Sequence, residues 1–358
     1  MSGLIRAVID TQALRHNLHL LRTRAGRAKV MAVVKANAYG HGLVSTALAI
    51  QDATAFAVAR LEEGMSLRAA GITAPILLLE GVYSRSQLED AAQDGLDLVV
   101  HNERQIELLE QSEGAGRFTL WLKIDTGMNR LGFAPRDFAP ALKRIRMLRS
   151  APKKLRLMTH LACADERDGV VTREQVARFA EAAGDLRIET SIANSAGLLG
   201  GIAPLADWVR PGLALYGASP FEDQTAADFG LRPVMSLIST VLTVREVRRG
   251  ERVGYGGAWT AACDSRIAIV AAGYGDGVHR SFAMGTPVLV RKQRAPLVGR
   301  VSMDMIAVDV TGIAGVEVGT AATLWGEGLP VEEVARHAGT VPYELLCSVS
   351  QRVPLEPQ

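Results

Sequence analysis

Short apolar runs alternate with helix-like stretches through the first two thirds of the chain. Eight runs are typical of strands buried on both faces, because each is a short, nearly continuous series of apolar residues. They are residues 28–35, 55–59, 76–79, 96–100, 118–125, 155–160, 186–191 and 208–210. Stretches with helical spacing lie between most of them, at residues 42–50, 62–70, 86–93, 103–111, 135–148 and 173–183. This alternation predicts an α/β fold with a TIM-like (β/α)₈ barrel over residues 10–228.

The pattern changes after about residue 230. Residues 234–247 are rich in β-branched side chains, and further short strand candidates follow at 266–272, 287–291, 305–310 and 321–325. Glycine and aspartate separate these runs, and helical spacing returns at 331–337. We therefore expect a mainly β domain over residues 229–358, joined by an N-terminal strand within residues 1–9.

Composition narrows the classes of partner. The 358 residues carry a formal charge of +2, so neither a nucleic acid nor a membrane surface is expected as the main partner. The apolar runs are too short to cross a bilayer, and the first residues lack the apolar core of a signal peptide. Three scattered cysteines predict neither a disulfide framework nor a zinc site. We expect a cytoplasmic protein without a metal ion.

Functional groups stand where several of the barrel strands end. Catalytic residues of such barrels lie at the C-terminal ends of the strands. Lys35 ends the first run, Lys123 and Asp125 end the fifth, and His160 ends the sixth. A lysine held at the rim of a core is partly desolvated, which favours the neutral amine that attacks a carbonyl group. Each residue taken alone also has a purely structural interpretation. Lys35 could simply extend into water at the end of the strand, and His160 could be a hydrogen-bonded histidine at a strand end.

A second group of residues suggests an anion site. Asn194 and Ser195 follow the seventh run, and Arg210 and Gly212 follow the eighth. Hydroxyl groups, loop amides and helix N-termini bind phosphate, although Asn194 and Ser195 also fit a simple helix N-cap. A cofactor that carries both a phosphate and an aldehyde would match this site and the reactive lysine.

Six motifs carry a resemblance to a known family. They are VVKANAYGHG at 33–42, residues 123–132, ANSA at 193–196, WVRPG at 208–212, VGYGG at 253–257 and GRVSMD at 299–304. With these motifs the chain resembles, nearly end to end, the alanine racemases of fold-type III, which depend on pyridoxal 5'-phosphate (PLP). The resemblance implies interconversion of L-alanine and D-alanine by a homodimer whose active sites form between subunits.

The resemblance also implies a role for individual residues. Lys35 would bind the cofactor covalently and act as one acid/base, and Tyr255 from the partner subunit would act as the other. Further residues would hold the cofactor: Tyr39, Asn194, Ser195, Arg210, Gly212, Leu213 and Tyr343. Arg130, the Met303 amide and Tyr274 would face the substrate, and His160 would contact Tyr255. Lys123 matches a position that is carbamylated in some relatives, where the carbamate orients Arg130.

These roles are consistent with the chemistry of racemisation. One base on each face of the substrate removes the α-proton and returns it without turning the substrate over. Arg210 at the pyridine nitrogen would disfavour a proton there, which limits side reactions such as transamination. The chain departs from the family pattern at Ser191, which replaces a histidine found behind the arginine in some relatives, and at Ser302, which replaces a cysteine. Residues 274–280 also lack an expected proline, and residues 351–355 end without the usual second arginine.

Two other functions stay open at this point. A PLP-dependent decarboxylase on the same barrel would have a glycine triplet for the phosphate and a carboxylate at the pyridine nitrogen, where this chain has Arg210. A non-catalytic PLP-binding homeostasis protein would consist of a lone barrel, without the β domain that carries Tyr255.

Overall fold

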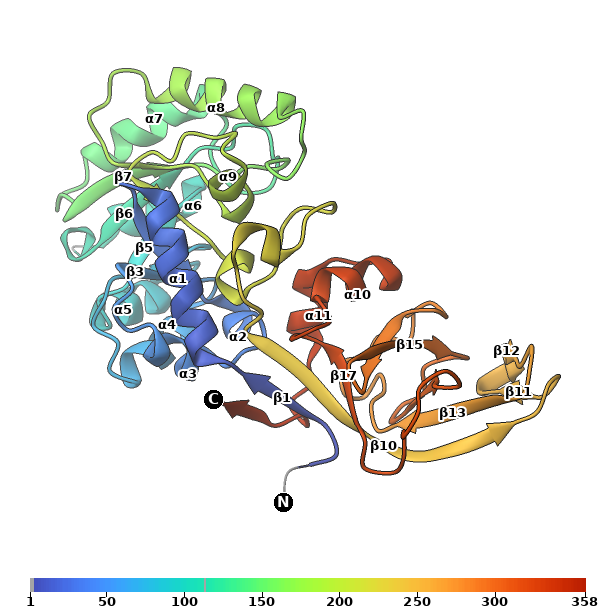
Figure 1. The fold of residues 1–358 in the computed structure, drawn as a ribbon. Coiled ribbons are helices and arrows are strands. Elements are labelled where there is room, and N and C mark those ends of the chain that lie inside the picture. The colour runs from blue at the N-terminus through green and yellow to red at the C-terminus, as the bar shows by residue number, and fades with distance from the viewer. Residues whose placement is uncertain (1–2, 113) are drawn as a thin grey trace. The chain divides into compact units, whose positions relative to one another are not determined.

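The computed structural model describes residues 3–112 and 114–358, which form two compact units (Figure 1). The barrel unit comprises Arg15–Ala38 and Leu43–Leu215. The β unit comprises the segment up to Leu14, the short segment Tyr39–Gly42 and Tyr216–Gln358. Within the described residues, no helix is long and apolar enough to cross a membrane.

Eight parallel strands close the barrel, which confirms the predicted fold class. They are β2 (Lys29–Val33), β3 (Ala55–Val58), β4 (Ile76–Leu78), β5 (Asp97–Val100), β6 (Thr119–Lys123), β7 (Lys154–Met158), β8 (Thr190–Ser191) and β9 (Trp208–Val209). β2 pairs with β9 to close the ring, with Val30 opposite Val209. Nearly every strand residue is buried, as expected for strands that have helices outside and a filled interior.

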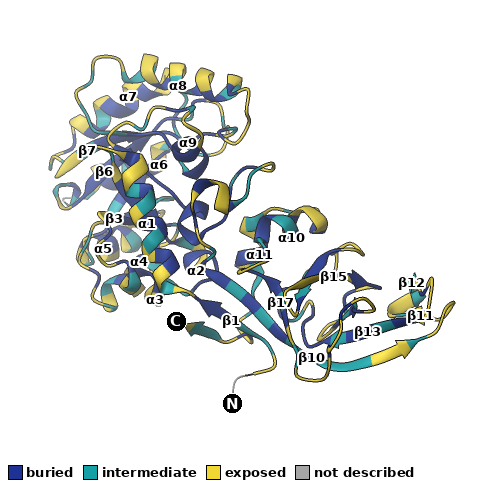
Figure 2. Cartoon of the chain, viewed as in Figure 1, coloured by how far each residue is buried: buried dark blue, intermediate teal, exposed yellow. Residues whose placement is uncertain are grey.

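Helices cover the outside of this barrel (Figure 1). They are α1 (Thr11–Ala25), α3 (Leu43–Ala49), α4 (Leu61–Ala69), α5 (Arg85–Gln93), α6 (Glu103–Glu110), α7 (Pro135–Arg146), α8 (Val170–Ala183) and α9 (Ser195–Gly200). The outward faces of α7 and α8 are exposed and their inward faces are buried (Figure 2). All six helices predicted between the strands are present. The prediction did not include α1 and α9, although Leu14, Leu18 and Leu21 of α1 are buried at helical spacing.

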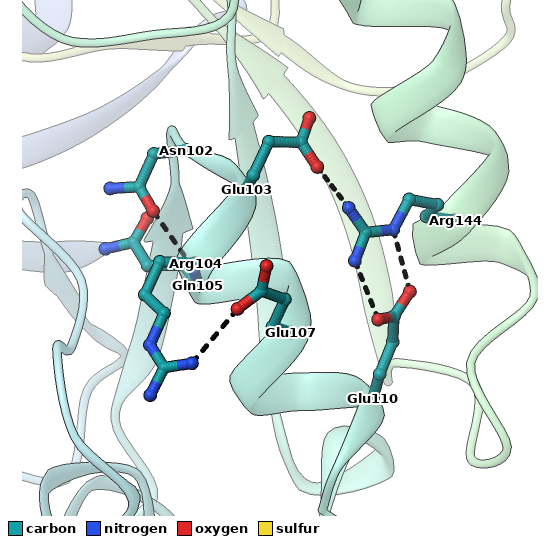
Figure 3. A network of polar contacts seen from close by, with 7 residues as sticks. All are labelled: Asn102, Glu103, Arg104, Gln105, Glu107, Glu110 and Arg144. Carbon is teal, nitrogen blue, oxygen red and sulfur yellow. Dashed lines mark hydrogen bonds and ion pairs between the residues drawn. The ribbon is translucent and has the colours of Figure 1, made fainter.

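An ion-pair network joins α6 to α7 on the barrel surface (Figure 3). Arg144 of α7 donates two hydrogen bonds to Glu110, at 2.8 and 2.7 Å, and a further one to Glu103. A bidentate pair of this kind fixes both partners better than a single contact does, but exposure to water limits its contribution to stability.

A second charged cluster, the barrel-floor cluster, lies near the N-terminal ends of the strands. The Arg156 guanidinium lies over the rings of both Trp121 and Trp208, at 5.0 and 4.8 Å from their centroids, and the two rings pack edge to face. The Glu189 carboxylate pairs with Arg156 and with Lys29, each at 2.5 Å. The indole rings and the carboxylate both stabilise the desolvated cation, and loss of the carboxylate would leave a buried charge without its ion-pair partner.

The β unit contains one eight-stranded sheet, in the order β13-β16-β15-β14-β17-β10-β1-β18. Its strands are β1 (Arg6–Ile9), β10 (Met235–Val247), β13 (Ser265–Val270), β14 (Pro287–Val290), β15 (Gln293–Val298), β16 (Ile306–Asp309), β17 (Ala321–Trp325) and β18 (Leu355–Pro357). β1 pairs with β10, and also with β18, so the first and last strands of the chain are neighbours. Strands β11 (Arg252–Val253) and β12 (Trp259–Thr260) form a separate hairpin, and helices α10 (Val331–Ala338) and α11 (Pro342–Ser348) follow the sheet.

In the first half of β10, residues 235–241, buried and half-buried residues alternate, which is the pattern of a strand with one face on a core. The predicted strands at 234–247, 266–272, 287–291, 305–310 and 321–325 all exist. The sequence analysis missed β15, because Gln293, Arg294 and Pro296 interrupt its apolar pattern. The described residues also contain the 3₁₀ turns η1 (Ala115–Arg117), η2 (Leu213–Tyr216), η3 (Ala226–Phe229) and η4 (Tyr255–Gly257).

Candidate active site

Lys35 follows β2 directly and begins an unusual turn, α2 (Lys35–Tyr39). The hydrogen bonds between β2 and β3 continue up to the residue before Lys35, since the Val34 amide donates to the Ala57 carbonyl at 2.8 Å. Ala36, Asn37 and Ala38 then adopt left-handed backbone angles, with φ between 54° and 55°. The strand thus ends abruptly at Lys35, whose side chain is half-buried at the rim of the barrel.

Lys123 is the last residue of β6 and is buried. Burial lowers the pKa of its ammonium to about 8, and the positive charges of Arg210, Arg130 and Lys35 contribute in the same direction. Four basic side chains from three strand ends therefore act on one another at the barrel rim. A sizeable fraction of Lys123 is neutral amine at slightly alkaline pH.

Arg210 is buried immediately after β9. Its guanidinium donates to the Thr159 carbonyl at 2.6 Å, to the Ser191 hydroxyl, and to His160 Nδ1 at 3.5 Å. Ser191 in turn donates to the Trp208 carbonyl at 2.8 Å, so its oxygen is fixed as an acceptor for the arginine. Burial lowers the pKa of Arg210 to about 10, and the group stays charged at neutral pH.

His160 follows β7 and faces this group of cations. Burial lowers the pKa of its imidazole well below the usual value, and the charges of Arg210, Lys123, Arg130 and Lys35 lower it further. The imidazole is therefore neutral near pH 7, and the positive charge in this part of the site belongs to Arg210.

The loop after β6 is built around the Asp125 carboxylate. It accepts the amides of Gly127, Asn129 and Arg130, at 3.0, 3.0 and 2.8 Å. Burial would raise the pKa of Asp125, but these amide hydrogen bonds outweigh it and lower the pKa. These hydrogen bonds hold the backbone of Arg130 in a fixed turn, and the Arg130 residue itself is exposed.

Ser195 is held as a hydrogen-bond donor at the start of α9. Its oxygen accepts the amides of Gly212 and Ala214, at 3.0 and 3.2 Å, so the hydroxyl proton is free to point to a further acceptor. Asn194 is the N-cap of α9 and accepts the Gly197 amide at 2.9 Å. Leu213, at the start of η2, is buried beside Gly212.

In the β unit, Tyr39 belongs to a cluster of aromatic rings. Its ring stacks on Tyr216 with centroids 4.8 Å apart, and Tyr343 of α11 lies 6.0 Å away. Burial raises the pKa of the Tyr39 phenol above its ordinary value, with a smaller contribution from Tyr343, so it is a neutral donor. Gly40 allows this packing, because a Cβ there would meet the Leu346 carbonyl oxygen at 2.1 Å.

The other predicted residues of the β unit lie on exposed turns. Tyr255 opens η4 and is 68% exposed. Tyr274 and Met303 lie on two loops that hydrogen bond to each other, with Tyr274 N donating to the Ser302 carbonyl at 3.0 Å. Gly273 permits this contact, since a Cβ there would meet the Met303 carbonyl oxygen at 2.3 Å.

A salt-bridge triad supports these two loops. Arg352 donates to Asp276 at 2.7 Å and to Asp304 at 2.8 Å, and Asp276 also accepts the Gly273 amide at 2.8 Å. Asp276 is buried, and the sequence analysis assigned no role to it or to Arg352.

The predicted site residues therefore divide into two groups. The barrel rim carries the larger group: Lys35, Lys123, Arg130, His160, Asn194, Ser195, Arg210, Gly212 and Leu213. The β unit carries Tyr39, Tyr255, Tyr274, Met303 and Tyr343. The sequence analysis did not assign Thr159 a role and noted Ser191 only as a departure, yet both hold Arg210. Their position at the ends of β7 and β8 was the available signal.

Comparisons with known proteins agree along the whole chain. The sequence model "Alanine racemase, N-terminal domain" matches residues 9–220, and "Alanine racemase, C-terminal domain" matches residues 234–356. Alanine racemases from Vibrio parahaemolyticus and from Shewanella sp. MR-7 are 47% and 48% identical to the chain, over 98% and 97% of both lengths. The crystal structure of biosynthetic alanine racemase from Pseudomonas aeruginosa superposes with a TM-score of 0.96 at 44% identity, covering all of both chains.

Proposed function

The chain belongs to the alanine racemase family, and from this premise we propose that it interconverts L-alanine and D-alanine with PLP as its cofactor. The observation that carries the proposal is the convergence of Lys35, Lys123, His160 and Arg210 at one barrel rim, in a chain that matches the family over its whole length. When bound, PLP supplies an electron sink that makes the α-proton of an amino acid acidic.

The donors at the barrel rim and around Tyr39 fit this cofactor. A phosphate needs donors, and the Ser195 hydroxyl has one proton to give because its oxygen already accepts two amides. We assign the remaining phosphate contacts to Tyr39, Asn194, Gly212, Leu213 and Tyr343. The neutral phenol of Tyr39 supports this, since a phenolate would repel phosphate.

The Lys35 amine would hold the cofactor through its aldehyde group, and the same amine would remove or return the α-proton on one face of the substrate. The Tyr255 hydroxyl of the partner subunit does the same on the opposite face. Tyr255 suits this task because 68% of its surface is exposed, on a turn shaped by Gly254 and Gly256. We assign the contact with Tyr255 of the partner subunit to His160, which accepts a hydrogen bond from Arg210.

Arg210 would face the pyridine nitrogen of the cofactor, where its positive charge would disfavour a proton. Its guanidinium donates to neutral groups on Thr159, Ser191 and His160, so none of these partners neutralises its positive charge. A decarboxylase of this barrel type would need a carboxylate in that place, and the buried arginine therefore favours the racemase.

Substrate binding falls to residues on rigid loops. We assign the alanine carboxylate to Arg130 and the Met303 amide, and the narrow space beside the α-carbon to Tyr274. A neutral Lys123 amine can add to carbon dioxide, forming an N–C bond and releasing one proton, which gives a carbamate beside Arg130. That anion would hold the Arg130 guanidinium toward the substrate.

Purified protein supplied with PLP tests the assignment. We expect it to be yellow, to lose the colour on borohydride treatment with the label on Lys35, and to bring pure L-alanine to zero optical rotation. The Lys35→Ala variant should stay colourless, whereas Lys143→Ala, an exposed lysine of α7, should behave as wild type. A colourless wild-type protein or a product other than D-alanine would overturn the proposal.

The shared active site has its own test. Mixing Lys35→Ala with Tyr255→Phe subunits places both changes in one site of a mixed dimer and leaves the other site intact. The mixture should regain about one quarter of wild-type activity, because half of the dimers are mixed and each has one good site. If both residues came from the same subunit, no intact site would form and activity would stay absent.

A further inference from the structure

The left-handed turn after Lys35 is strained. Four successive L-residues, Ala36, Asn37, Ala38 and Tyr39, have φ between 52° and 55°. Side chains crowd the backbone in this conformation, so such residues usually occur singly and persist only where the surroundings hold them. The turn must therefore have specific supports.

The Glu63 carboxylate is one such support, and it comes from outside the turn. Glu63 lies in the first turn of α4, which follows β3, the neighbour of β2 in the barrel. One of its oxygens accepts the Ala36 amide at 2.7 Å. The other accepts the amides of Ala59 and Arg60, at 2.9 and 3.1 Å. A single carboxylate thus joins the residue after Lys35 to the end of the next strand.

The rest of the turn has other means of support. Asn37 tolerates the left-handed region, and its side chain accepts the Leu43 amide at 2.8 Å. Ala38 is buried and donates its amide to the Val34 carbonyl at 2.9 Å. Ala36 is exposed, so packing does not hold it, and its recorded hydrogen bond goes to Glu63.

We propose that Glu63 is a positioning residue for Lys35: its carboxylate holds the Ala36 amide and so fixes the direction in which the lysine leaves the strand. The inference rests on the proposed function in taking the Lys35 amine as the reactive group. Glu63 contacts neither substrate nor cofactor in this proposal and acts through the backbone.

The carboxylate cannot be replaced by an amide of the same shape. Both oxygens of Glu63 accept N–H groups, whereas glutamine offers one acceptor oxygen and one NH₂ donor. In Glu63→Gln, either Ala36 or the Ala59–Arg60 pair must face a second donor. Several residues of α4 are buried and hold the helix in place, whereas Ala36 is exposed. We therefore expect the Ala36 amide, and not the Ala59–Arg60 pair, to lose its hydrogen bond.

The test compares Glu63→Gln with Glu62→Gln, its exposed neighbour on the same helix. In the cofactor-free protein, we expect the hydrogen-exchange rate of residues 36–39 to rise about tenfold or more in Glu63→Gln, because the turn loses one charge-assisted hydrogen bond. In the PLP-loaded protein, kcat should fall by a similar factor with little change in KM, and its pH profile should shift. Glu62→Gln should match wild type throughout.

A glycine rescue separates positioning from general stability. Glycine adopts the left-handed conformation without a side-chain clash, so adding Ala36→Gly to Glu63→Gln should restore most of kcat. Ala69→Gly, an exposed position at the right-handed end of α4, should restore nothing.

Wild-type behaviour of Glu63→Gln, or equal rescue by the two glycines, would overturn the proposal. It would also fall if both Glu63→Gln and the Ala36→Gly double variant were unfolded, since Glu63 would then support the barrel as a whole. Failure of the proposed function looks different: the wild-type protein itself would not racemise alanine, while the exchange experiment would still report on Glu63.

Discussion

The barrel-floor cluster makes the stability of the barrel unit depend on the charge of Glu189. Glu189→Gln keeps the size of the side chain and an oxygen that can accept the Trp208 indole N–H, which lies at 3.3 Å. It removes the negative charge between Lys29 and Arg156. Arg156, with a side chain only 8% exposed, would then keep its two indole rings but lose the carboxylate that its guanidinium contacts.

The size of the loss follows from the pKa of Glu189. Burial alone would raise this pKa, but hydrogen bonds from Lys29, Arg156 and Trp208 lower it from 4.5 to about 2. That difference corresponds to at most about 3.4 kcal/mol, at about 1.36 kcal/mol per pKa unit. The Glu189 side chain is 33% exposed, so screening by water reduces the value. We expect Glu189→Gln to lose about 2 kcal/mol at pH 7.

The sign of the pH dependence follows as well. A carboxyl group whose pKa is lower in the folded protein stabilises the fold above its unfolded pKa, here about 4.5, and loses this contribution as the pH falls toward 2. Wild type should therefore lose its advantage over Glu189→Gln between pH 4.5 and about 2. Near the acid end of that window the two proteins should converge.

Urea unfolding of both proteins between pH 7 and pH 3 measures this difference. The matched control is Glu110→Gln in the surface network with Arg144 (Figure 3), which should lose at most about 1 kcal/mol because that pair is open to water. Equal midpoints for Glu189→Gln and wild type at pH 7, or a gap as large at pH 3 as at pH 7, would refute the reasoning.

Three further changes probe the active site. Lys123→Ala should lower kcat/KM about tenfold or more, with partial recovery in added acetate, and ¹³C-bicarbonate should give a carbamate signal in wild type; a missing signal would exclude the carbamate. Arg210→Glu should slow racemisation and release a transamination product, which chromatography detects; its absence would contradict the assigned role. Arg352→Met should raise KM for alanine several-fold with less effect on kcat, because the loops that carry Tyr274 and Met303 lose the ion pairs of Arg352 with Asp276 and Asp304. An unchanged KM would disprove this.

Much of the barrel was predictable because its strands are buried on both faces. Runs such as residues 55–59 and 96–100 stand out as apolar whatever surrounds them, and even the two-residue strand at Trp208 was found. β15 shows the opposite case, since it pairs through its backbone while Arg294 and Pro296 break the apolar pattern. An antiparallel strand needs neither a continuous apolar run nor an amide at every position, so its sequence gives a weaker signal.

The candidate site divides in the same way. Lys35, Lys123, His160 and Arg210 were predictable because strand ends of a barrel meet at one rim. Residues that act through a distant partner were not. Thr159 holds Arg210 across 51 positions of sequence, and Glu63 holds Ala36 across 27. Contacts of this kind form only when the strands have closed into a barrel, so the local sequence around each residue does not predict them.

The pairing of β1 with β18 has a consequence for synthesis on the ribosome. The barrel can close once β9 has emerged, because its last strand ends at Val209. The sheet of the other unit must wait for residues 355–358, since Gln358 N donates to the Ile9 carbonyl at 2.9 Å. Domains generally fold as units during translation. A nascent chain would therefore carry a finished barrel, with β1 of the other unit unpaired on one side, until residues 355–358 have emerged.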